Sequence, residues 1–141
     1  MKGNIMEKMK LVVDTGAITV SIVDKEGNEL GEFNFVPTDF DIIDRYENTM
    51  KYFRERKIED SDEFEFAKNF SNEIKEQIDI LLNSDASKSL FAKCSPLTPL
   101  ADGTLFFENV LEQIGVLVEK TTKKRIESTM KKVEKATEKY K

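Results

Sequence analysis

Carboxylates are the side chains in this sequence whose spacing brings several potential reactive groups together. Asp39, Asp41, Asp44 and Glu47 form one cluster, in which helical spacing would place Asp44 beside Glu47. Hard cations prefer several carboxylate oxygens, but the glycine of a calcium-binding loop is missing here. Acidic side chains are also favoured in the first turn of a helix, where the helix dipole is positive. We therefore expect this cluster to open a helix and predict no metal site.

A second acidic run, Glu59–Glu63, and the single cysteine are the other candidates for catalysis. A catalytic carboxyl pair needs one carboxyl buried enough to raise its pKa, whereas we expect this polar run to be a solvated loop in which Asp60 or Ser61 caps a helix. The chain has no histidine, so Cys94 has no imidazole base to form its thiolate. We therefore predict a protein that is not an enzyme and has no cofactor.

Composition indicates one cytoplasmic domain. The chain has 141 residues, of which 39% are hydrophobic and 35% are charged, so it is long enough to bury a core without disulfides or metals. It has no run of 18 apolar residues and no apolar signal-peptide stretch near Met1. A single cysteine fits a reducing compartment. Residues 1–8 are expected to form a disordered tail.

The first part of the chain has the pattern of β-strands. We expect strands at Lys10–Asp14, Ile18–Asp24 and Leu30–Val36, because apolar residues alternate with polar ones and turn residues separate the runs. The fold class predicted for the chain is α+β, with a three-stranded antiparallel meander over residues 10–36 and a helical bundle over 38–118.

Three apolar stripes at helical spacing follow the strands. We expect the helix that carries the first stripe to be capped by Thr38 and the helix that carries the second to end at Asn83. A short helix at 85–92 and a loop at 94–103 are expected before the third. The first stripe consists of Phe40, Ile43, Tyr46, Met50 and Phe53. The second consists of Phe66, Phe70, Ile74, Ile78 and Leu81. The third, which begins near residues 102–104 and belongs to a long C-terminal helix, consists of Phe107, Val110, Leu111, Ile114, Leu117 and Val118.

The C-terminal extension, residues 119–141, differs in charge from the globular part, residues 1–118. The extension holds nine basic and four acidic residues, whereas the rest of the chain holds 13 basic and 23 acidic residues. Its apolar residues continue at helical spacing through Ile126, Met130, Val133 and Tyr140. Three interpretations stay open: a protein-binding seam, which we favour, a solvated extension, and a surface for nucleic acid or membranes. Glutamates between the lysines weaken the last one.

Several short motifs carry a family resemblance. They are Val36-Pro37-Thr38-Asp39-Phe40 with Asp44-Arg45-Tyr46, the Ser95-Pro96-Leu97 turn, and Asp102-Gly103 before Leu105-Phe106-Phe107-Glu108-Asn109-Val110. In these residues the chain resembles the small tail assembly chaperones of siphophages and prophages of Firmicutes. The resemblance implies a protein that coats the hydrophobic tape measure protein in the host cytoplasm and helps to recruit tail tube subunits.

The favoured function is therefore a non-enzymatic tail assembly chaperone. Its expected partners are proteins, including a second copy of itself, and neither nucleic acid nor membrane. The alternatives are a structural virion component, such as a tail tube or head–tail joining subunit, a regulatory or host-targeting interaction protein, and an enzyme that uses carboxylates. The residues expected to contribute to protein binding are Phe40, Ile43, Met50, Phe107, Val110, Ile114, Ile126, Met130, Val133 and Tyr140, with Phe70 and Ile74 supporting the core.

Overall fold

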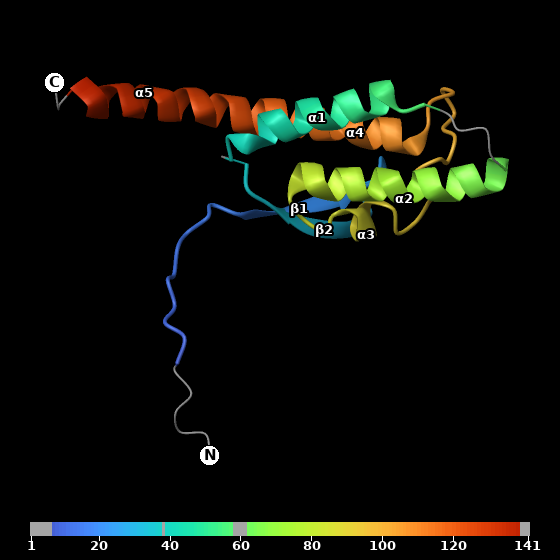
Figure 1. Cartoon of the computed structure of the whole chain (residues 1–141), viewed down its shortest axis with the longest axis horizontal. Helices are drawn as coiled ribbons and strands as arrows, with labels where there is room; N and C mark the ends of the chain where they lie inside the picture. The colour runs from blue at the N-terminus through green and yellow to red at the C-terminus, as the bar shows by residue number, and fades with distance from the viewer. Residues whose placement is uncertain (1–6, 38, 58–61, 139–141) are drawn as a thin grey trace, which may run out of the picture.

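A computed structural model describes residues 7–37, 39–57 and 62–138, with the side chains of 121–123 and 126 outside the description. The fold is α+β, as predicted: a two-stranded antiparallel sheet is followed by helices (Figure 1). The elements are β1 (Ile18–Val23), β2 (Glu29–Phe35), α1 (Asp41–Glu55), α2 (Glu63–Leu82), α3 (Ser87–Leu90), α4 (Phe106–Leu117), a π-helical segment (Val118–Lys123) and α5 (Lys124–Glu138).

The sheet is a hairpin, so the predicted three-stranded meander is corrected to two strands. Val20 lies opposite Phe33, and Ile18 lies opposite Phe35, which places the apolar side chains of both strands on one face. The segment predicted as a first strand, Lys10–Asp14, is not part of the sheet. Its large apolar side chains are exposed to solvent, because it runs away from the body of the molecule instead of along β1 (Figure 1).

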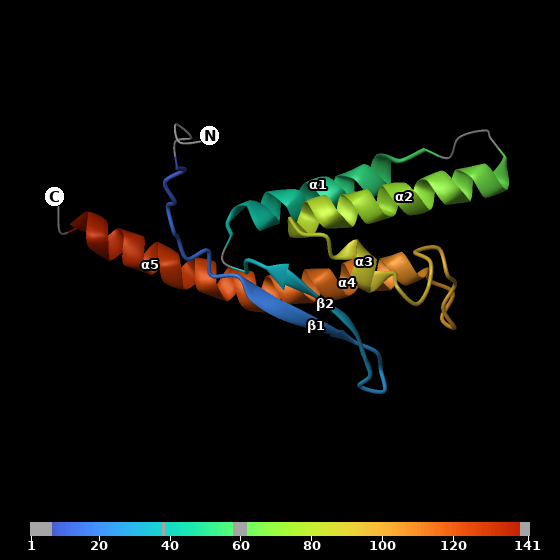
Figure 2. The same cartoon turned by 90° about the horizontal axis from the view of Figure 1, so that it is seen from below.

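The helices bury the β2 part of the apolar face of the hairpin in a shared core, against which Val20 and Ile22 of β1 are only partly buried. In the view of Figure 2 the α1–α2 pair lies on one side of α4 and the hairpin on the other, whereas Figure 1 shows α4 alongside α1 and α2 nearer the hairpin. The core contains Phe33 and Phe35 from β2, Ile74, Ile78 and Leu81 from α2, and Phe107, Val110, Leu111 and Ile114 from α4. These residues of α2 and α4 belong to the apolar stripes predicted from the sequence, so those two stripes are confirmed as core-forming.

The apolar stripe of α1 is only partly the predicted one. Ile42 is fully buried, whereas its neighbour Ile43 is 40% exposed and Phe40 is 48% exposed. Thr49 is buried as well, and its hydroxyl donates a hydrogen bond to the carbonyl oxygen of Arg45 over 2.8 Å. The core-facing stripe of α1 therefore begins at Ile42 in place of Phe40 and Ile43, and it continues through the predicted Tyr46, Met50 and Phe53, which are partly buried against the core.

Helix boundaries follow local hydrogen bonding. Helix α1 begins at Asp41, whose backbone N–H donates to Oδ1 of Asp39; the predicted cap, Thr38, lies outside the described residues. Helix α2 is capped by Asp62, whose Oδ1 accepts from the N–H of Phe64 over 3.1 Å; Asp60 and Ser61 also lie outside the described residues. Asn83 ends α2 in the left-handed conformation with φ 49°, a common way to end a helix.

Helices α4 and α5 follow one another along one line, joined by the π-helical segment at Val118–Lys123. Figure 1 shows α5 extending beyond the other helices, with its far end away from the core. A π-helical turn is a rare irregularity that changes which side chains face a given side of a helix. It lies at the position where the sequence changes from an apolar to a basic, polar character.

Candidate protein-binding groove

An open groove separates the inner face of the hairpin from α4. Its volume is about 670 Å³, larger than the space between closely packed elements. The hairpin and α3 contribute Val20, Ile22, Val23, Leu30, Phe33 and Leu90. The opposite side is made by Leu100, Phe106, Val110, Ile114 and Leu117. Polar residues, among them Asp24, Lys25, Asp102, Asn109 and Gln113, also line it, so the groove combines an apolar lining with a few polar groups.

The hairpin side of the groove is held by a tight turn at Asp24–Asn28. Oδ1 of Asp24 accepts hydrogen bonds from the backbone N–H groups of Glu26 and Asn28, each over 2.9 Å. The carboxylate of Asp24 accepts from the backbone N–H of Asn28 and from the side-chain amide of Asn28, and these two hydrogen bonds, in that order, lower the pKa of Asp24. Gly27 adopts φ 87°, a conformation that costs glycine little. The turn fixes the spacing of β1 and β2 at one end of the groove.

The α4 side is held by the loop before it. Asp102 accepts hydrogen bonds from the hydroxyl and the backbone N–H of Thr104, over 2.6 and 3.0 Å, and these lower the pKa of Asp102. The carboxylate of Glu108 accepts from the N–H of Leu105 over 3.0 Å, which satisfies a donor at the start of α4. The N–H of Phe106 donates to the carbonyl of Thr98 over 2.8 Å. These bonds fix where α4 begins relative to the hairpin.

The residues predicted for protein binding fall into different places. Val110 and Ile114 line the groove, although both are largely buried. Phe107 belongs to the core, where its ring lies 5.5 Å from that of Phe53 and 6.0 Å from that of Phe70 between centroids. Met50 is partly buried against the same core. Among the predicted residues whose side chains the structure describes, only these two, Val110 and Ile114, line the groove.

Four other predicted residues, all in the described part of the chain, lie outside the groove. Phe40 and Ile43 are exposed near the start of α1. Met130 is 46% exposed and Val133 is 50% exposed on α5. The side chain of Ile126 and the whole of Tyr140 lie outside the described part of the chain. We name Met130 and Val133 the α5 seam, since they lie three residues apart on the same side of that helix.

The sequence prediction missed several groove residues. Val20 and Ile22 of β1 were expected to face a core through their alternation with polar residues, but not to line an open groove. Phe106 and Leu117 were not selected, although both border the selected residues of α4. The periodicity identifies the apolar face of each element; only the distance between β1 and α4 leaves that face partly uncovered.

Of the acidic cluster first considered for metal binding, Asp39 has structural partners. Asp39 forms an ion pair with Arg45 over 3.0 Å, and Arg45 Nε donates to the carbonyl of Leu81 over 3.0 Å. Across residues 7–37, 39–57 and 62–138, no group of three or more His, Cys, Asp or Glu is placed to hold a metal ion. Cys94 is a free, half-buried thiol.

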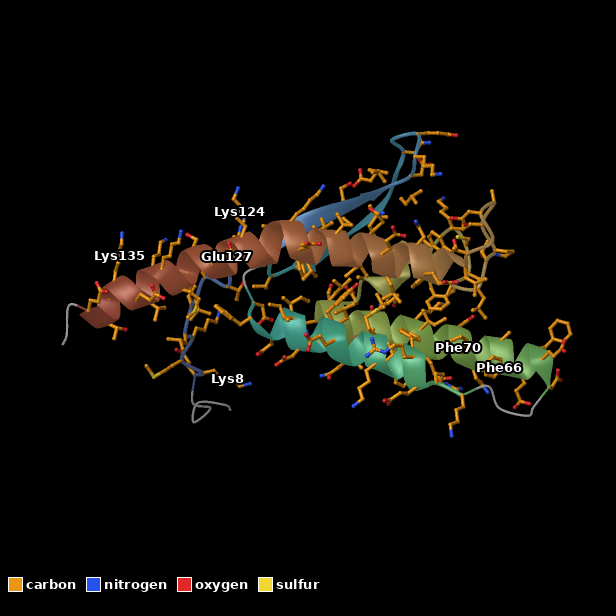
Figure 3. All side chains as sticks on the ribbon, turned by 90° about the horizontal axis from the view of Figure 1, so that it is seen from above. Lys8, Phe66, Phe70, Lys124, Glu127 and Lys135 are labelled. Carbon is orange, nitrogen blue, oxygen red and sulfur yellow. The ribbon has the colours of Figure 1, made fainter. Side chains whose placement is uncertain are left out.

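A charged cluster joins α1 to α2 away from the groove. The guanidinium of Arg56 donates from Nε and Nη2 to the two carboxylate oxygens of Glu73, over 2.9 and 2.8 Å, and the Tyr52 hydroxyl donates to Glu73 Oε1. Hydrogen bonds from Arg56 and then Tyr52 lower the pKa of Glu73, and the bond to Glu73 raises the pKa of Tyr52. Arg56 also lies over the rings of Phe66 and Phe70, at 5.6 and 5.8 Å from their centroids; both rings are labelled on α2 in Figure 3.

Comparison of the chain with protein-family models, with curated proteins and with solved structures found no match. In the part of the chain that the structure describes, no helix has both the length and the hydrophobicity needed to cross a bilayer.

Proposed function

We propose that this protein is a non-enzymatic assembly chaperone of the cytoplasm that holds an apolar helix of a partner protein. The observation that carries the proposal is the apolar groove of about 670 Å³ between β1 and α4. An apolar face that a folded chain leaves uncovered beside its own core is typical of a surface that another polypeptide covers.

The dimensions of the groove suit a helical ligand. The lining residues of α4 run from Phe106 to Leu117, a span of roughly 17 Å at the helical rise of 1.5 Å per residue. This length accepts about three turns of a partner helix, whose apolar side chains at positions i, i+3, i+4 and i+7 would enter the groove. Asn109 and Gln113 are exposed polar residues on the α4 side and would orient the ligand through hydrogen bonds.

Helix α5 supplies a second contact in this proposal. It projects from the body in line with α4, so a long partner helix that leaves the groove past Leu117 would next meet the α5 seam. Figure 3 shows Lys124 and Lys135 on one side of α5, exposed beside its acidic residue Glu127. The mixed charge keeps the exposed helix soluble, and the two half-exposed seam residues give it a narrow apolar side.

The family resemblance names the partner class. Tail assembly chaperones bind the tape measure protein, a long and hydrophobic helical protein, and recruit tail tube subunits. A chaperone needs apolar surfaces and an acidic body that keeps the complex soluble, and this chain carries a formal net charge of −5. We therefore propose the tape measure protein as the ligand of the groove and the α5 seam.

Coexpression with an apolar coiled-coil fragment of a tape measure protein tests the proposal. We expect the fragment, which aggregates when expressed alone, to become soluble and to elute with the chaperone from a sizing column. An unrelated acidic protein of similar size serves as the control for nonspecific solubilisation. A fragment that stays insoluble, or that elutes separately, would contradict the proposal.

A structural virion component is the second candidate, because among the described residues the sheet has two strands and β1 pairs with β2 alone. Subunits that form rings often extend their sheets from one copy to the next. Mass spectrometry of purified virions distinguishes the two candidates, since a chaperone is absent from the finished particle and a structural subunit is present in many copies.

A further inference from the structure

The segment before β1 has the pattern of a β-strand but pairs with nothing in the described part of the chain. Met9, Leu11 and Val13 alternate with Lys10 and Val12, so the first three would share one face of a strand. In the structure Met9 is 98% exposed, Leu11 and Val12 are each 90% exposed and Val13 is 66% exposed. We call residues 9–13 the N-terminal arm. Four large apolar side chains exposed within five residues are unfavourable, and pairing with a sheet edge would bury one face of the arm.

Strand β1 offers such an edge. Its backbone pairs with β2 on one side, and within the described residues no hydrogen bond links the backbone of β1 to another element. The other strand is covered, because α3 lies against β2: Ser89 Oγ donates to the carbonyl of Glu32 over 3.0 Å. Figure 2 shows α3 beside β2 and not beside β1. The groove also reaches β1, since Val20, Ser21 and Ile22 all line it.

We propose that the N-terminal arm of one copy adds to the β1 edge of a second copy, forming a dimer by reciprocal strand exchange. The arm would be a third strand of the partner's sheet, with Leu11 and Val13 continuing the apolar face made by Val20 and Ile22. The same arrangement places Lys10 on the opposite face. Its charge is opposite in sign to Glu29 and Glu32, which are exposed on β2, one strand beyond β1.

Local structure favours a second copy over the arm's own β1. Asp14 Oδ1 accepts from the N–H of Gly16 over 2.9 Å, and Thr15 Oγ1 accepts from the N–H of Ala17 over 3.3 Å. These turn bonds, with Gly16 at φ 74°, direct the arm away from β1, and Lys8 lies far from the hairpin in Figure 3. Folding back onto the same chain would break this turn, whereas exchange between two copies keeps it. The inference is independent of the proposed function, because it requires no partner protein.

Sedimentation equilibrium over a concentration series of the full chain tests the exchange. We expect the average mass to rise from the monomer value of 16.2 kDa toward twice that value as the concentration increases. Leu11→Asp should weaken dimer formation at least about 10-fold, because it places a charge on the face that would be buried. Val12→Asp is the matched control: it adds the same charge to the neighbouring residue on the opposite face and should change the dimer affinity less than about 3-fold.

Both substitutions are in an exposed segment, so the fold of the monomer is preserved and circular dichroism should be unchanged. A wild-type chain that stays at the monomer mass up to millimolar concentration would overturn the proposal. Equal effects of Leu11→Asp and Val12→Asp would overturn it as well, since the apolar face would then have no special role. If the wild-type chain is monomeric and the Leu11→Asp variant melts at a lower temperature than the wild type, the arm pairs with its own β1 instead. None of these results bears on whether the groove binds a tape measure helix.

Discussion

Gly31 of β2 and Ser89 of α3 lie in direct contact: a Cβ atom at position 31 would lie 2.7 Å from the Cβ and 2.9 Å from the Oγ of Ser89. Real Cβ atoms do not approach other atoms this closely, so only glycine fits. The contact also allows Ser89 Oγ to reach the carbonyl of Glu32. Together these interactions place α3 beside β2 and leave β1 as the open side of the sheet.

Gly31→Ala should therefore lower the free energy of unfolding by about 1–3 kcal/mol, the usual range for overpacking a close contact. Urea denaturation measures the change. Ser89→Gly removes the clashing side chain, and its own cost is about 1–2 kcal/mol, from the lower helix propensity of glycine and the lost hydrogen bond to the carbonyl of Glu32. The double variant should therefore recover part of the loss caused by Gly31→Ala, giving a coupling energy of at least about 1 kcal/mol. Strictly additive effects would contradict the contact.

The helices whose apolar residues recur regularly at helical spacing could be predicted from the sequence. Ile74, Ile78 and Leu81 recur at helical spacing and are all fully buried in α2. In α1 the same rule allows two faces, because Ile42 and Ile43 are adjacent and both fit a stripe that includes Tyr46 and Phe53. Only the packing against α2 and the hairpin selects Ile42, so the sequence alone could not decide between the two.

The groove could not be predicted for a different reason. The alternation of Ile18, Val20 and Ile22 indicates an apolar face, and the stripe of Val110 and Ile114 indicates another, but neither shows how far apart the two faces lie. The N-terminal arm shows the same limit: its pattern predicts a strand, yet the turn at Asp14–Ala17 separates it from β1. Local patterns define faces, and tertiary geometry decides which faces meet.

The Arg56–Glu73 pair predicts a pH dependence of stability. Hydrogen bonds from Arg56 and Tyr52 lower the pKa of Glu73 in the folded protein below its usual value of 4.5. The ionised carboxylate therefore stabilises the fold fully above pH 4.5, and this stabilisation is lost as the pH falls through the lower folded-state pKa. Glu73→Gln should lower the free energy of unfolding by about 1–2 kcal/mol at pH 7. The difference between wild type and variant should shrink as the pH falls below 4.5. Thermal denaturation between pH 7 and pH 3 measures it.

Tyr52 should give the opposite pH dependence, a loss of stability as the pH rises. Its hydrogen bond to Glu73 raises the pKa of the phenol above 10.0, so this bond contributes stability below pH 10.0 that is lost as the pH rises through the folded-state pKa. Tyr52→Phe should remove this alkaline dependence and leave the fold intact. An unchanged alkaline limb in Tyr52→Phe would show that the hydroxyl does not bind Glu73 in solution.

Gln113 and Val116 give a matched pair of substitutions for testing the groove. Both are exposed on α4, but Gln113 lines the groove and Val116 does not. Gln113→Arg should weaken binding of an apolar tape measure helix by about 10-fold, because the ligand would have to bury a charge without a partner. Val116→Arg adds the same charge outside the groove and should change the Kd by less than about 3-fold. Fluorescence anisotropy with a labelled helix measures both; equal losses would argue against the groove as the binding site.

The α5 seam can be tested with the same helix ligand. Met130 is half exposed and lies on one side of α5 with Val133, while Ser128 is exposed on the opposite side by its helical position. Met130→Asp should weaken the binding of a long tape measure fragment by about 10-fold, since it puts a charge where the complex would bury an apolar contact. Ser128→Asp adds the same charge and should leave the affinity within about 3-fold of wild type. A short ligand that fills only the groove should be insensitive to both variants. Equal affinity of Met130→Asp and wild type for the long fragment would show that α5 makes no contact with the partner, and would restrict the binding surface to the groove between β1 and α4.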